Sequence, residues 1–125
     1  MKKANLFYLD NLLIHCVEGM YEKKQADLSN YEKYLDQYHA VIGQYSVEEK
    51  TATIEGLRSA LTVLLNNPGV LDLNAWFNDA ALHYLDSDEE VHRLLQRVWA
   101  YFFPHDDWRV DGHRFSADDI ERVEP

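Results

Sequence analysis

Apolar residues recur at helical spacing in five stretches of the chain. They predict helices over residues 3–18, 30–42, 47–65, 73–85 and 91–102. In the last two, apolar side chains occupy positions i, i+3, i+4, i+7 and i+8, which gives each helix one continuous apolar face. The first helix carries Leu6, Leu9, Leu12 and Leu13 together with Cys16, so we expect it to be central to the core.

Local signals at the helix ends agree with this periodicity. A serine precedes a glutamate by three residues before three of the helices, as in a capping box, and Ser116 with Asp119 is a weaker example that predicts a short terminal helix. The three pairs are Ser29 with Glu32, Ser46 with Glu49, and Ser87 with Glu90. Asp72 is a further N-cap candidate. Gly43 and Pro104 follow predicted helix ends, and Gly56 inside a helix favours close packing of another element against it.

The residues after Pro104 change character. Trp108, Val110 and Phe115 flank an Asp111-Gly112 pair that suits a tight turn, which predicts a small hairpin pinned to the helices by Trp108 and Phe115. The sequence therefore predicts a single all-α domain over residues 1–125. We expect a compact bundle of about five to six helices with a small hairpin or turn near the C-terminus.

Three tyrosines share one face of the predicted 30–42 helix: Tyr31, Tyr34 and Tyr38. The favoured interpretation is a core face whose hydroxyl groups reach the rim. The alternative is a tyrosine-rich interface through which the protein associates with itself. For the oligomeric state, we expect a monomer or a weak homodimer.

Charge excludes some partners and favours others. The net charge is −10, and it is concentrated in one half of the chain: residues 1–65 have 7 Lys and Arg against 9 Asp and Glu, whereas residues 66–125 have 5 against 13. Nucleic acid and anionic membrane surfaces both attract positive charge, so neither is an expected partner. A localised acidic surface favours a basic protein partner.

The remaining composition fits the cytoplasm. Cys16 is the single cysteine, so no disulfide can form within the chain, and its apolar neighbours favour a small buried side chain over a nucleophile. No apolar run approaches the roughly 20 residues that cross a bilayer. Asp10, Asn11 and His15 interrupt the N-terminal apolar run, which argues against a signal peptide.

Candidate chemistry is weak by comparison. Asp107, Asp111 and Asp118 are spaced as in part of a calcium loop, but Arg109 stands where that loop needs an oxygen ligand. His105 or His113 beside aspartates could act as a general base, yet no nucleophile motif or phosphate-binding loop accompanies them. We therefore predict no cofactor and no bound metal, and a metal-dependent or hydrolytic enzyme is the less favoured function.

Acidic residues near the start of the last helix and in the tail form the candidate site. The helix dipole explains only the group that precedes the helix. We predict that both groups form one partner-binding surface with two aromatic anchors: Asp86, Asp88, Glu89, Tyr101, Asp106, Asp107, Trp108, Asp111, Asp118 and Asp119.

In size, acidity, helix content and aromatic–acidic composition, the whole chain resembles small bacterial immunity proteins, including those of contact-dependent growth inhibition systems. This resemblance implies a cytoplasmic protein that binds and neutralises a cognate basic toxin domain, often a nuclease. It is a resemblance of class, so it assigns a role to no single residue.

Overall fold

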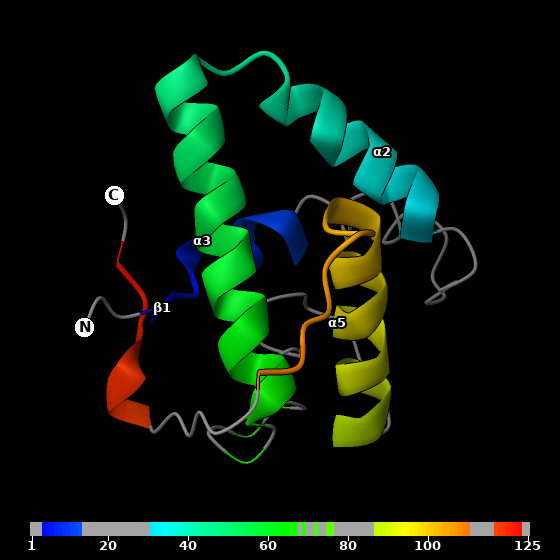
Figure 1. Cartoon of the computed structure of the whole chain (residues 1–125), viewed down its shortest axis with the longest axis vertical. Coiled ribbons are helices and arrows are strands. Elements are labelled where there is room, and N and C mark those ends of the chain that lie inside the picture. Colours follow the sequence, from blue (N-terminus) through cyan, green and yellow to red (C-terminus); the bar gives the residue numbers. More distant parts are fainter. Residues whose placement is uncertain are drawn as a thin grey trace.

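The computed structural model describes residues 4–13, 31–67, 69, 72, 75–76, 87–110 and 117–123. Most of these residues are helical. The main elements are β1 (Ala4–Asn5), α2 (Tyr31–Ile42), α3 (Val47–Asn66), α5 (Asp88–Phe102), the 3₁₀ helix η2 (Ala117–Asp119) and β2 (Ile120–Glu121). A further helical segment covers residues 7–13. In Figure 1, α3 and α5 run along the long axis of the molecule, and α2 crosses one end of it.

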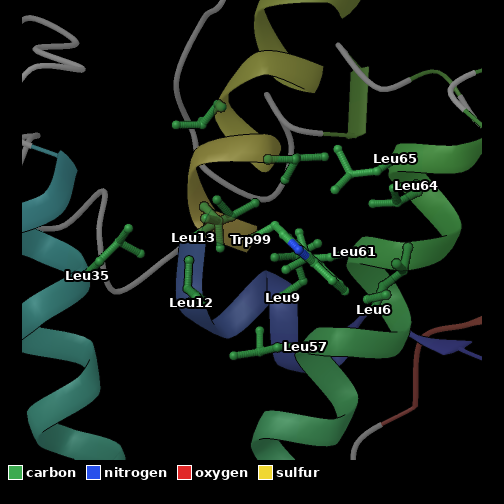
Figure 2. Packing of buried hydrophobic residues seen from close by; sticks show 14 of the residues in the cluster. Leu6, Leu9, Leu12, Leu13, Leu35, Leu57, Leu61, Leu64, Leu65 and Trp99 are labelled. Carbon is green, nitrogen blue, oxygen red and sulfur yellow. The ribbon is translucent and has the colours of Figure 1, made fainter. Parts of the chain in front are cut away.

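The core forms around the helical segment at residues 7–13. Leu9, Leu12 and Leu13 are completely buried, and Leu6 is nearly so. Figure 2 places these leucines between α3, α5 and α2, with Trp99 of α5 beside Leu9 and Leu61. Burying a leucine side chain contributes roughly 1.5–3 kcal/mol, so this short segment is a major source of stability. The expectation that the N-terminal helix is central to the core is confirmed.

The structure confirms the three long helices that apolar spacing predicted. Each presents its predicted apolar stripe to the core: Tyr34, Leu35, Tyr38 and Ile42 from α2; Leu57, Ala60, Leu61 and Leu64 from α3; Val91, Leu94, Leu95, Val98 and Trp99 from α5. The serine caps are also present where both partners are described. Ser46 Oγ accepts from the Glu49 amide at 3.2 Å, and Ser87 Oγ accepts from the Glu90 amide at 3.3 Å.

The predicted start of the first helix is wrong. Ala4 and Asn5 form a parallel strand pair with Ile120 and Glu121, and the helical residues begin at Phe7. Asn5 explains the difference, because its side-chain oxygen accepts from the Phe7 amide and from the Val123 amide, at 3.1 Å each. One side chain thus caps the helical segment and fixes the end of the chain beside it.

The predicted number of helices also differs from the structure. In the described part of the chain, α2, α3 and α5 are the long helices, and the expected terminal helix is only the single 3₁₀ turn η2. The predicted helix over 73–85 lies outside the described residues except for Ala75 and Trp76. Its N-cap is described, since Asp72 Oδ1 accepts from the Ala75 amide at 3.1 Å. The turn at Asp111 and Gly112 lies outside the described residues as well.

After α5, residues 103–110 fold back between α5 and α3 (Figure 1). The indole N–H of Trp99 donates to the Asp106 carbonyl at 2.9 Å. The side-chain amide of Asn66, the last residue of α3, donates to the Trp108 carbonyl at 2.7 Å and accepts from the Val110 amide at 2.9 Å. A single asparagine therefore pairs with the tail as a neighbouring strand would, and it fixes the position of Trp108.

Gly56 of α3 lies in close contact with the ring of Tyr8, and substituting it tests how tightly the N-terminal segment packs against α3. A methyl group at this position would overlap the ring of Tyr8, so the tyrosine ring would have to move. We expect Gly56→Ala to destabilise the protein by about 1–3 kcal/mol through overpacking, offset in part by a gain of roughly 0.5–1 kcal/mol in helix propensity. Urea denaturation monitored by circular dichroism measures the net loss.

Ser59→Ala is the matched control, because Ser59 is exposed on the same helix. It should change the free energy of unfolding by no more than about 0.5 kcal/mol. A Gly56→Ala protein as stable as this control would contradict the described contact between Tyr8 and α3.

Candidate functional site

The first turn of α5 carries two of the predicted partner-binding residues. Asp88 and Glu89 are exposed there, directly after the N-cap Ser87. Together with His92, Arg93 and Gln96 they line a surface hollow of about 400 Å³. Their charges complement the positive end of the helix dipole, so they stabilise the helix and still face solvent. Asp86 lies outside the described residues.

His92 connects this hollow to the tail. Its Nε2 donates to the Leu65 carbonyl at 2.9 Å, and its Nδ1 accepts from the Gln96 amide at 2.8 Å. The ring of Trp108 packs edge-on against the imidazole, with 5.5 Å between ring centroids. The structure therefore brings Trp108 close to the hollow that contains Asp88 and Glu89.

Asp106 and Asp107 each face an arginine of the same chain. Asp106 forms an ion pair with Arg58 at 2.8 Å, and the Arg58 guanidinium also lies 5.3 Å from the ring centroid of Trp99. Asp107 accepts from the backbone amide of Arg109 at 2.9 Å and pairs with its side chain at 3.3 Å. These arginines partly offset the negative charge of the tail, so Asp106 and Asp107 contribute less potential than their exposure suggests.

Tyr101 lies apart from the other candidate anchor. It points toward α2, where its hydroxyl donates to the Asp36 carboxylate and its ring packs edge-on against His39, with 6.3 Å between centroids. Burial, followed by the hydrogen bond to Asp36 and the charges of Asp36 and Glu32, raises the pKa of Tyr101 to about 12. Tyr101 thus links α5 to α2 rather than joining Trp108.

Asp118 and Asp119 belong to η2, the part of the tail that directly precedes β2. In Figure 1, η2 and the first turn of α5 lie toward the same end of the molecule, on either side of the C-terminal end of α3. The segments that carry Asp88, Glu89, Trp108, Asp118 and Asp119 therefore lie toward one end, which we call the acidic end, with α3 between the two groups of acids. Asp111 lies outside the described residues.

The tyrosine face of α2 is part of the core. Tyr34 and Tyr38 are only 6% and 5% exposed, so their rings pack inside the protein as the favoured interpretation held. The side chain of Tyr31 is not among those described. Self-association through these rings would require the core to open.

Sequence reasoning missed a second hollow, which we call the aromatic cleft. It has a volume of about 460 Å³ and lies between the helical segment at 7–13, α2 and the first turns of α3. Four aromatic residues and two glutamates contribute to its lining: Phe7, Tyr8, Tyr38, Tyr45, Glu48 and Glu49. The sequence does show Tyr45 close to Glu48 and Glu49. We interpreted the acidic residues there only as part of the capping box at Ser46, so they did not indicate a binding site.

Within the described ranges, no group of three or more His, Cys, Asp or Glu side chains could hold a metal ion. His105 is exposed, whereas His113 lies outside these ranges. None of the described helices has both the length and the apolar character needed to cross a membrane. Comparison with family models, curated proteins and solved structures found no match for the chain.

The raised pKa of Tyr101 can be tested in solution. An acid whose folded pKa is raised binds its proton more tightly in the folded state, so its contribution to stability is present below pH 10 and is lost as the pH rises toward 12. The ring carbon resonance of Tyr101 is assigned by its absence from the spectrum of Tyr101→Phe. We expect this resonance to titrate with a midpoint near pH 12. Asp36→Asn should move the midpoint back toward 10, and equal midpoints in the two proteins would contradict the hydrogen bond.

Proposed function

We propose that the protein is an immunity protein, or inhibitor, that binds a cationic toxin domain through its acidic end and thereby neutralises it. The observation that carries this proposal is the position of Asp88 and Glu89. Both carboxylates are exposed beside a surface hollow, and Trp108 packs against the histidine that lines it. Opposite charge accelerates encounter, and a large aromatic side chain at the edge can then be buried against the partner.

The charge balance of the whole chain supports the same function. A net charge of −10 attracts basic proteins over a distance set by the ionic strength. Asp106 also ties the tail to α3 through its ion pair with Arg58, and the exposed acids in the first turn of α5 add to the attraction at the acidic end.

The direct experiment tests whether this protein restores growth to cells that express a toxic domain encoded by an adjacent gene. The C-terminal domains of the proteins encoded by the adjacent genes are expressed singly in a sensitive host, with and without this protein. We expect one domain to arrest growth and this protein to restore it by forming a 1:1 complex. If none of these domains is toxic, or if none that is toxic is neutralised, the proposed function is wrong.

A charge-reversal pair locates the interface in that complex. Asp88→Lys with Glu89→Lys should weaken binding at least about tenfold, mainly by slowing association, and the effect should shrink as salt increases. Surface plasmon resonance at several ionic strengths measures both quantities. Thermal unfolding is measured first, since reversing these charges also removes a favourable interaction with the helix dipole.

Glu32→Lys with Glu55→Lys is the control, because it changes the net charge equally at exposed positions of α2 and α3. Its effect on affinity should be much smaller. If the two double variants weaken binding equally, net charge alone drives the association and the acidic end is not the interface.

A further inference from the structure

We propose that the aromatic cleft is a second binding site, which takes the guanidinium group of an arginine presented by a partner protein. The cleft is about 460 Å³ in volume, which is within the range of typical ligand pockets. This inference goes beyond the proposed function, because it concerns a different surface. In Figure 1 the first turn of α3, which borders the cleft, and the first turn of α5 lie at opposite ends of the molecule.

The aromatic walls suit a delocalised cation. Tyr8, Tyr38 and Tyr45 come from three different segments, and Phe7 packs edge-on against Tyr8 with 5.7 Å between centroids. The negative faces of such rings attract a guanidinium group, which can also stack on them. Tyr45 is 39% exposed, so its ring remains accessible to a side chain that enters from solvent.

The position of Tyr8 is fixed before any ligand arrives. Its ring occupies the space that a side chain at position 56 would fill, and only a glycine allows this contact with α3. A wall that is already ordered loses little conformational entropy on binding. The cleft is therefore prepared for a ligand without rearrangement of the core.

The rim supplies the matching charge. Glu48 and Glu49 are exposed in the first turn of α3 and contribute to the lining, and none of the described lining residues is a lysine or an arginine. Two carboxylates beside aromatic rings favour arginine over lysine, because a guanidinium group can donate to both carboxylates while it stacks. Charge complementarity thus identifies the occupant as a cationic side chain.

The test uses the intact protein and a small probe, N-acetyl-arginine methylamide, in an NMR titration. We expect saturable shifts of the backbone amides at residues 45–53. The citrulline analogue, which has nearly the same shape without the charge, should bind at least about tenfold more weakly, and the lysine analogue should lie between the two. No saturable shift up to about 50 mM probe would overturn the proposal, as would equal binding of arginine and citrulline.

Two substitutions assign the contacts. Tyr45→Leu should weaken probe binding severalfold, and Tyr45→Phe should retain it, because the aromatic face provides the attraction. Glu48→Gln should also weaken it severalfold. Equal binding by Tyr45→Leu and Tyr45→Phe, or by Glu48→Gln and the natural protein, would contradict the assigned site.

Glu55→Gln is the matched control, since Glu55 is exposed on the same helix as Glu48 but does not line the cleft. It should leave probe binding unchanged, whereas equal loss of binding in this variant would show that negative charge anywhere on α3, and not the cleft, holds the probe. The titration needs no toxin, so its failure leaves the proposed function standing and failure of toxin rescue leaves the cleft standing. Shifts at 45–53 on dilution without probe would identify a second copy of this chain as the occupant and overturn the proposal.

Discussion

Burial of the leucines at residues 7–13 is the constraint on which the rest of the structure depends. Leu9, Leu12 and Leu13 point in several directions around a short segment, and no single helix could cover all of them. They are fully removed from water because α3, α5 and α2 each cover a different side. The same arrangement creates the aromatic cleft. Tyr8 lies next to Leu9 in this segment, and burial of the leucines brings its ring against α3 at Gly56.

Two asparagines connect this core to the tail that carries most of the candidate site. Asn5 binds the Val123 backbone through both its oxygen and its amide nitrogen, and Asn66 binds Trp108 and Val110 in the same manner. The tail thereby gains the hydrogen bonds of a strand without a full sheet. The acidic residues of the tail therefore have defined neighbours. Asp106 and Asp107 each lie beside an arginine, which offsets part of their negative charge.

The long helices could be predicted because their signals are local. Apolar spacing and serine caps act within a few residues, and α2, α3 and α5 appear where those signals place them. The strand pair and the asparagine contacts join residues 42 to 118 positions apart, and two-residue strands have no detectable period. For the same reason sequence alone grouped Tyr101 with Trp108, although Asp36, a partner 65 residues away, draws Tyr101 toward α2.

We propose that the acidic end binds a cationic partner protein. Hydrogen–deuterium exchange of the free protein and of its complex with the neutralised toxin domain tests it most directly, because it maps the covered surface without altering any charge. We expect slower exchange at residues 87–93, 107–110 and 117–119 in the complex. Protection confined to the exposed face of α2, with these three segments unchanged, would contradict it.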